Sequence, residues 1–202
     1  MIHQAAADIK AAVDELSKLD SATGDGDHGS AMMRSMTAAC KAIDAAEDSA
    51  KPKDILHQVG WGVMSDAGGC TGPLLGSMLM GLGDGFADKA ELDAPATAAA
   101  FESALASLQK QTKAQPGDKT MMDAIVPAVT EMRNAADAGG GVSEVLAAGA
   151  RAAAAGAEAT SAMQARFGRA KNLGERSIGS VDAGARSMSI LLAGFATAVK
   201  DN

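Results

Sequence analysis

Apolar residues along this chain recur at steps of three and four, which is the spacing of one face of an α-helix. The first stripe is predicted to end near Asp20 and contains Ile9, Ala12, Val13, Leu16 and Leu19. The next helix carries Met32, Met33, Met36, Cys40 and Ile43. Further helices are predicted over Lys53 to Ser65, Pro73 to Phe86, Thr97 to Lys113, Met121 to Ala136, Ser143 to Ala159 and Gly184 to Val199. Runs of β-branched and aromatic residues are missing, so we expect an all-α chain of about eight helices.

Short loops between these helices favour antiparallel neighbours, as in an up-and-down bundle or a closed helical barrel. Thr120 and Asp123 resemble a capping box at the sixth helix, and the sequence AGGG at residues 138–141 is expected to stop it. No linker-like change of composition divides the chain, so we expect residues 1–202 to form a single domain. The methionines are interpreted as flexible filler of the core rather than as the lining of a ligand or lipid cavity.

The charge balance narrows the range of partners. The formal net charge is -7 and no basic run is present, which argues against general binding of nucleic acid or of an anionic membrane. No stretch of about 18 apolar residues suggests a membrane span, and the first residues lack the apolar run of a signal peptide. Cys40 and Cys70 have no CxxC spacing and are expected to be reduced. We therefore expect a soluble, cytoplasmic protein that binds small molecules or other proteins.

The first interruption of the helical pattern is LDSATGDGDHGS, which supplies the carboxylates of Asp20, Asp25 and Asp27 within eight residues. Glycines allow the tight turns that would bring the carboxylates to one point, where they repel unless a cation lies between them. Oxygen ligands favour Mg²⁺ or Ca²⁺. An EF-hand is excluded, because a loop counted from Asp25 puts Met36 where a bidentate glutamate is needed. The alternative is a solvated turn with an Asx cap.

Two further interruptions carry weaker signals. The sequence DAGGCTGPLLG, Asp66 to Gly76, is a glycine-rich loop before a helix, which can offer backbone N–H groups to a phosphate, with the Thr71 hydroxyl as another donor. It is not a Walker A loop, and tight helix packing explains its glycines equally well. The sequence QPGDKTMMD, Gln115 to Asp123, is short enough to be only a helix cap.

The fourth interruption, Met163 to Ser187, runs for some 25 residues with weak apolar periodicity, and long irregular segments of this kind tend to be binding loops or lids. Its cationic residues outnumber Glu175 and Asp182, so an anion such as a nucleotide phosphate would suit it. A solvated surface loop is the alternative. The cationic residues are Arg166, Arg169, Lys171, Arg176 and Arg186.

A carboxylate cluster, a glycine-rich N–H cradle and an arginine-rich loop together indicate a Mg-nucleotide site. At this point the chain resembles a known family, the nucleotide-binding L subunit or domain of dihydroxyacetone kinases. The resemblance spans nearly the whole chain in the family's order. The matching motifs are LDSATGDGDHG (19–29), GGCTGPLLG (68–76), GDKTMMDAIVPA (117–128), GAEAT (156–160) and GRAKNLGERSIGSVDAG (168–184).

The resemblance implies a closed barrel of about eight antiparallel helices with the nucleotide at one rim. Asp20, Asp25 and Asp27 would hold two Mg²⁺ ions that in turn hold the phosphates of ADP or ATP, and Arg169 would contact phosphate. These four are the implied catalytic residues. The other implied nucleotide contacts are His28, Ser30, Ala31, Gly69, Cys70, Thr71, Gly117, Asp182, Ala183 and Gly184.

The resemblance further implies a phosphotransferase that is active only with a separate K subunit, which holds dihydroxyacetone or a related short ketose. The donor is either ATP or a phosphocarrier protein of the sugar phosphotransferase system acting on bound ADP. The family often has HQDPG where this chain has residues 180–184 and Asn where it has Ala31, which leaves room for another ketose such as a tetrulose. A non-catalytic Mg-nucleotide-binding regulatory module is the competing function. Alone, the protein is expected to be a monomer or a homodimer.

Overall fold

The computed structural model describes residues 1–47, 49–66 and 71–200, and every regular element in these ranges is a helix, as predicted. Two short 3₁₀ helices, η1 (Thr160–Ala162) and η2 (Arg169–Ser177), lie in the connection before the last α-helix. The α-helices are α1 (Ile2–Ala11), α2 (Val13–Ser21), α3 (His28–Asp44), α4 (Pro52–Asp66), α5 (Thr71–Phe86), α6 (Ala94–Gln109), α7 (Met122–Asp137), α8 (Val142–Ala159) and α9 (Ala183–Lys200).

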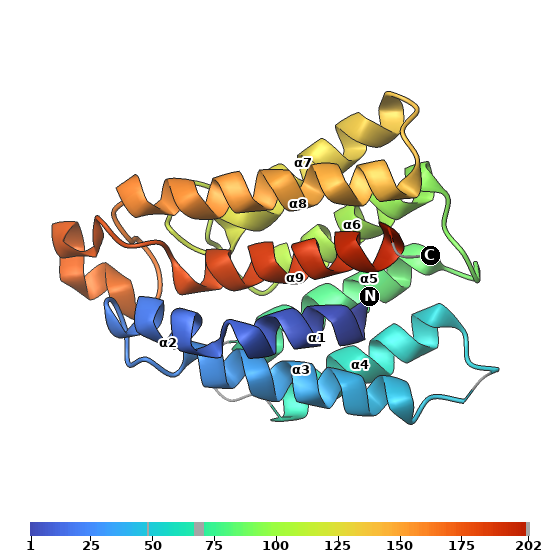
Figure 1. Cartoon of the computed structure of the whole chain (residues 1–202), viewed down its shortest axis with the longest axis horizontal. Coiled ribbons are helices and arrows are strands. Elements are labelled where there is room, and N and C mark those ends of the chain that lie inside the picture. Colours follow the sequence, from blue (N-terminus) through green and yellow to red (C-terminus); the bar gives the residue numbers. More distant parts are fainter. Residues whose placement is uncertain (48, 67–70, 201–202) are drawn as a thin grey trace.

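The helices form a closed ring (Figure 1). From α3 to α9 each helix packs against the next along the chain, α3 also packs against α1, and α9 returns to α1. Helix α2 continues α1 beyond a break at Ala12, where φ is -101° and ψ is 6°, so the two helices act as one wall of the barrel. The single first helix expected from the sequence is thus interrupted, but the predicted barrel of about eight antiparallel walls is confirmed.

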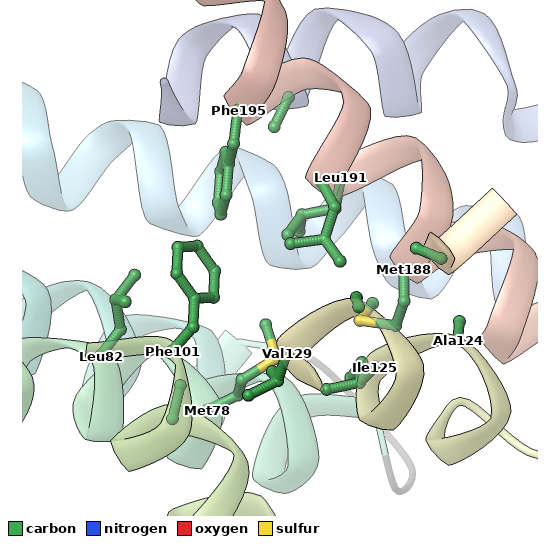
Figure 2. Close-up of a cluster of buried hydrophobic side chains, with 14 of the residues drawn as sticks. Met78, Leu82, Phe101, Ala124, Ile125, Val129, Met188, Leu191 and Phe195 are labelled. Carbon is green, nitrogen blue, oxygen red and sulfur yellow. The ribbon is translucent and has the colours of Figure 1, made fainter. Parts of the chain in front are cut away.

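Side chains from many of these helices fill the centre of the ring in one hydrophobic cluster. Figure 2 shows Met78 and Leu82 of α5, Phe101 of α6 and Phe195 of α9 within it. The rings of Phe101 and Phe195 meet at a tilt, with their centroids 6.4 Å apart. Methionine fills core space as predicted, since several methionines are buried: Met32, Met36, Met78, Met122, Met132 and Met188.

Glycines allow some of the helix pairs to approach closely. A Cβ atom at Gly29 would lie 2.1 Å from the carbonyl oxygen of Val13, and one at Gly156 would lie 2.1 Å from the carbonyl oxygen of Asp123. Both obstacles are backbone atoms of the neighbouring helix, which cannot rotate away as a side chain can. These two glycines therefore set how close α3 lies to α2 and how close α8 lies to α7.

The antiparallel order places the interrupted stretches at one end of the barrel. Because neighbouring helices run in opposite directions, the connections 22–27, 110–121 and 160–182 and the start of α5 lie at the same rim. Residues 20–28 and the α8–α9 connection (residues 160–182) both lie at the left in Figure 1, where α2 ends and α9 begins. The connections 45–51, 87–93 and 138–141 lie at the opposite end. The described parts of the four candidate stretches thus belong to one rim.

Helix boundaries differ from the sequence prediction mainly at the rim. Helix α6 ends at Gln109 rather than at Lys113, and α5 begins at Thr71, two residues before Pro73. Helix α9 begins at Ala183, so the last five residues of the expected loop 163–187 are helical. Helix α7 ends at Asp137, followed by Gly139 with a φ of 85°, so the AGGG sequence stops the helix as predicted. None of the described helices is long and apolar enough to cross a membrane.

Candidate functional site

The three aspartates singled out in the sequence come together at the rim. One carboxylate oxygen from each of Asp20, Asp25 and Asp27 lies within 4.8 Å of the others. Asp20 is half-buried in the last turn of α2, whereas Asp25 and Asp27 are exposed in the loop that leads into α3. We refer to residues 20–28 as the aspartate loop.

Glycines and one backbone hydrogen bond shape the aspartate loop. A Cβ atom at Gly24 would lie 2.5 Å from Oδ1 of Asp20, and Gly26 has a φ of 78°, which L side chains rarely adopt. The backbone N–H of His28 donates a hydrogen bond to Oδ2 of Asp20 at 3.2 Å. The loop therefore turns back on the carboxylate of Asp20, as its glycine content predicts.

The carboxylate cluster fits a hard divalent cation. Its oxygen ligands are of the kind that Mg²⁺ and Ca²⁺ prefer, and its two exposed members leave room for water or phosphate oxygens in the rest of the coordination shell. Carboxylates this close repel one another unless a cation or a cationic side chain lies nearby. The residues present thus suit a magnesium ion, and the spacing required for an EF-hand is absent from this loop.

His28 links the aspartate loop to α9. Its Nε2 lies 2.9 Å from Oγ of Ser187, and that hydroxyl also lies 2.9 Å from the carbonyl oxygen of Gly184. The ring nitrogen and the Ser187 hydroxyl therefore share one hydrogen bond, whose direction depends on the tautomer of His28. Burial lowers the pKa of His28, against the opposing influence of Asp20 and Asp27, so the ring is neutral at pH 7. This contact holds the start of α9 beside the aspartate loop.

The arginines of the α8–α9 connection (residues 160–182) meet carboxylates of neighbouring segments. Arg169, in η2, forms an ion pair with Asp25, and Arg166 lies 3.7 Å from Asp118. Arg186 lies in α9 and pairs with Glu15 of α2 at 2.7 Å, so the expectation that it belongs to the cationic loop is wrong. The sequence suggested a loop with excess positive charge, and the tertiary structure brings acidic partners to it.

Asp123 organises the α6–α7 connection (residues 110–121). Its carboxylate is buried and accepts hydrogen bonds from the backbone N–H of Gly117 at 2.5 Å and of Thr120 at 2.8 Å. The second bond is one half of the predicted capping box. Gly117 has a φ of 95° and open space where a Cβ atom would lie, so backbone conformation rather than crowding requires glycine there.

Asp182 caps the start of α9. Its carboxylate accepts a hydrogen bond from the backbone N–H of Ala185 at 2.7 Å, and a Cβ atom at Gly184 would lie 3.1 Å from the same oxygen. Burial raises the pKa of Asp182 to about 6, although the Ala185 N–H and the Lys119 ammonium lower it. The turn from Asp182 to Gly184, implied by the resemblance, therefore lies next to His28 through the Ser187 contact.

This pKa predicts an unusual dependence of stability on pH. Because the folded-state pKa of Asp182 lies above its ordinary value of 3.8, the folded state binds this proton more tightly than the unfolded chain. The contribution of Asp182 is therefore most favourable below about pH 4 and falls by up to about 3 kcal/mol as the pH rises through 6.

Urea unfolding in metal-free buffer at pH 4, 5, 6 and 7 tests this dependence. Asp182→Asn keeps an oxygen that can cap α9 but cannot titrate. The free energy of unfolding of the wild type should fall relative to that of the variant over this pH range. If the difference in free energy of unfolding between the two proteins does not change with pH, the raised pKa of Asp182 is contradicted.

The remaining predicted contacts within the described residues lie at the same rim, with different orientations. Ser30 is exposed and donates to the carbonyl oxygen of Asp27 at 2.8 Å, whereas Ala31 is buried and its N–H donates to that same oxygen at 2.9 Å. Thr71 is the first residue of α5. Gly69 and Cys70 lie outside the described residues. Ala183 begins α9 and is buried.

Sequence reasoning missed two residues that connect the parts of this site, Lys119 and Ser187. Lys119 was part of a stretch interpreted as a possible helix cap, and its side chain is 2% exposed. Ser187 lies where the irregular stretch and the predicted last helix overlap, and it is fully buried on α9. Neither has a local sequence signal, since a lysine in a Gly-Asp-Lys-Thr loop and a serine in a helix are usually solvated.

The fold and the site together define a class of protein, a closed helical barrel that gathers aspartates, a histidine and an arginine at one rim. The family model for the DAK2 domain matches residues 22–197. The chain therefore belongs to the DAK2 domain family, and the resemblance inferred from its motifs is confirmed.

Similar proteins fall into two sizes. The ADP-binding subunit DhaL of the PEP-dependent dihydroxyacetone kinase of Escherichia coli is 35% identical over 189 residues, which cover 92% of this chain and 88% of that subunit. The D-erythrulose kinase of Mycolicibacterium smegmatis is 35% identical over 180 residues, but these are 89% of this chain and 31% of that enzyme. The chain thus spans about a third of the erythrulose kinase and most of the length of the E. coli subunit.

A solved structure shows the same fold. The dihydroxyacetone kinase of C. freundii, crystallised with AMP-PNP and Mg²⁺, matches with a TM-score of 0.75 over 98% of this chain and 33% of that chain. Sequence identity is 23%, so this likeness supports the fold alone.

Proposed function

We propose that this chain, as a single domain over residues 1–202, is the nucleotide-binding subunit of a short-ketose kinase. It would carry Mg-ADP or Mg-ATP at the rim of the barrel and pass the phosphoryl group to a ketose held by a separate K subunit. One observation carries the proposal. The carboxylates of Asp20, Asp25 and Asp27 lie together at one rim of the barrel, and the guanidinium of Arg169 contacts Asp25 there. Proteins of similar length are named as ADP-binding subunits of dihydroxyacetone kinases.

In this proposal the aspartates ligate two Mg²⁺ ions, which supply charge neutralisation on the phosphate oxygens when bound. Asp20 is oriented by the His28 N–H, and the exposed Asp25 and Asp27 can reach a cation from the open side of the rim. Arg169 lies against Asp25 and would therefore be within reach of phosphate oxygens on that cation. The protein's own contribution is mainly positioning and electrostatics, as expected for phosphoryl transfer.

The other proposed nucleotide contacts surround this centre. Helix α5 begins with Thr71, and helix N-termini favour phosphate binding. Since the Ala31 side chain is buried and its N–H is already bonded within the helix, Ala31 would contribute mainly by leaving space beside Ser30. The full set of proposed contacts is His28, Ser30, Ala31, Gly69, Cys70, Thr71, Gly117, Arg169, Asp182, Ala183 and Gly184.

In this proposal a partner supplies the site that holds the ketose. The erythrulose kinases that it matches are about three times as long, which leaves room in those proteins for another domain. We propose a separate K subunit in that role, acting in the cytoplasm where nucleotides are available. Similar proteins are named as PEP-dependent or PTS-dependent dihydroxyacetone kinases and as erythrulose kinases, so a triose and a tetrulose are both represented among their substrates.

The first experiment identifies the nucleotide. The protein is purified in Mg²⁺, desalted and denatured, and any released nucleotide is identified by mass spectrometry. Near-stoichiometric ADP supports a permanently bound coenzyme that a phosphocarrier rephosphorylates. An empty protein that binds ATP with micromolar, Mg²⁺-dependent affinity supports an ATP-exchanging kinase. Absence of binding to either nucleotide would overturn the proposal.

Arg169→Ala is expected to weaken ADP more than adenosine. A guanidinium–phosphate contact is a charge-assisted hydrogen bond worth about 1.5–3 kcal/mol, so the Kd for Mg-ADP should rise roughly tenfold or more. The Kd for adenosine, which has no phosphate, should change by less than about twofold. Isothermal titration calorimetry measures both. Equal weakening of the two ligands would place Arg169 at the base or in the fold instead.

A further inference from the structure

Lys119 is buried at the base of the α8–α9 connection. Its side chain is 2% exposed, and its ammonium donates to the carbonyl oxygen of Thr160 at 2.6 Å and to that of Ser180. Thr160 is the residue at which the chain leaves α8, and Ser180 is where it returns to the barrel before α9. One ammonium from the α6–α7 connection thus joins both ends of a loop far away in the sequence.

Further hydrogen bonds close the same base. The N–H of Asp182 donates to Oγ1 of Thr160 at 2.8 Å, and the N–H of Gly179 donates to the carbonyl oxygen of Ser161 at 2.8 Å. These bonds join the two ends of the connection to each other. Lys119 in turn joins both ends to the α6–α7 connection. The orientation of the connection relative to the barrel therefore rests on Lys119 together with the backbone N–H of Arg166, which donates to the carbonyl oxygen of Asp118 at 3.1 Å.

The position of Lys119 has an energetic cost. Its φ is 60°, in the left-handed region that residues other than glycine rarely occupy. Burial lowers the pKa of its ammonium, although the carboxylates of Asp182 and Asp123 oppose that effect. A strained backbone and a buried charge persist where the surrounding structure holds them in place, here through two carbonyl oxygens.

We propose that Lys119 is a positioning residue for the phosphate-binding arginine. It fixes both ends of the α8–α9 connection and so holds Arg169 against Asp25 of the aspartate loop. The inference rests on the proposed function for its effect on nucleotide binding. The two hydrogen bonds of Lys119, which we call the clamp, are a property of the protein without ligand.

Lys119→Met tests the clamp, with Lys113→Met as the matched control because Lys113 is exposed in the same connection. Exposed trypsin sites in the α8–α9 connection report how firmly its base is held: Arg166, Arg169, Lys171 and Arg176. Without nucleotide, cleavage there should be at least about tenfold faster in Lys119→Met, because a closed arrangement that falls to about a tenth leaves the open, cleavable arrangement at about nine tenths. Lys113→Met should be cleaved at the wild-type rate.

Binding measurements then separate positioning from general loss of structure. If the competent arrangement falls to about a tenth, the Kd for Mg-ADP rises about tenfold, whereas the Kd for adenosine should stay within about twofold. Unchanged cleavage, or equal weakening of ADP and adenosine, overturns the inference. If the wild type binds neither Mg-ADP nor adenosine, the proposed function fails. The cleavage comparison still decides whether Lys119 holds the base of the α8–α9 connection.

A second variant covers the case in which Lys119→Met does not fold. Lys119→Gln keeps a polar side chain at this position, but it is shorter and uncharged and so loses the ammonium that donates to the carbonyl oxygens of Thr160 and Ser180. It should show the same two effects to a smaller degree, faster cleavage in the α8–α9 connection and selective weakening of ADP. Wild-type behaviour in both assays would overturn the inference.

Discussion

Asp25→Ala should abolish the stabilisation that Mg-ADP gives to the wild-type protein. A ligand present at 100 times its Kd stabilises a protein by about 2.7 kcal/mol, which raises the melting temperature of a domain of this size by roughly 5–10 °C. Asp25 contributes one of the three clustered carboxylates and also contacts Arg169. Its loss therefore removes a cation ligand and the anchor of the proposed phosphate-binding side chain together.

Thermal scans with Mg²⁺ and with and without ADP measure this effect. Without ligand, Asp25→Ala should melt close to the wild type, because Asp25 is exposed and its removal relieves repulsion among the carboxylates. Asp14→Ala, an exposed aspartate on α2, is the control and should keep the full shift. Removing Mg²⁺ with a chelator should abolish the wild-type shift. A full ADP shift in Asp25→Ala would refute the metal assignment.

Gly29→Ala is expected to destabilise the fold, whereas Gly62→Ala should stabilise it. The added methyl group at Gly29 would lie 2.1 Å from the backbone carbonyl oxygen of Val13, so α3 must move away from α2. Overpacking of this kind costs about 1–3 kcal/mol, and the movement also separates His28 and Asp27 from Asp20. The Mg-ADP shift should therefore weaken together with stability.

Gly62 offers the opposite case in another helix. A Cβ atom there meets its nearest neighbours at 3.7 and 3.9 Å, which is ordinary contact. Replacing glycine by alanine inside a helix should then stabilise the protein by about 0.5–1 kcal/mol. Urea unfolding of the two variants should give changes of opposite sign. If both variants are destabilised by similar amounts, the close approach of α3 to α2 at Gly29 does not explain the destabilisation.

Much of the fold could be predicted because the apolar period of a helix is visible within a short stretch of sequence. The period of apolar residues places α4, α7, α8 and α9 within about a residue of their observed ends. The break at Ala12 was missed, since it lies within a run of apolar residues at helical spacing that predicts one continuous helix. The aspartate loop was found because three carboxylates among glycines are an unusual local pattern.

The contacts between the loops of the rim had no such local pattern. Arg169 was expected to meet a phosphate, but its pairing with Asp25 joins residues 144 positions apart, and sequence periodicity says nothing about a pair so distant. Lys119 was overlooked because a lysine in a polar loop is usually solvated, and only its two distant carbonyl acceptors make it a buried clamp.

By itself the sequence determined that the protein is helical, how long its helices are and which short stretches interrupt them. These features depend on residues within a turn or two of one another, where backbone hydrogen bonding and the apolar period are decided. The tertiary structure alone decided that the interrupted stretches share one rim, that His28 reaches Ser187 and that Lys119 joins both ends of the α8–α9 connection. Those contacts depend on how the barrel closes, and closure is a property of the whole packed chain.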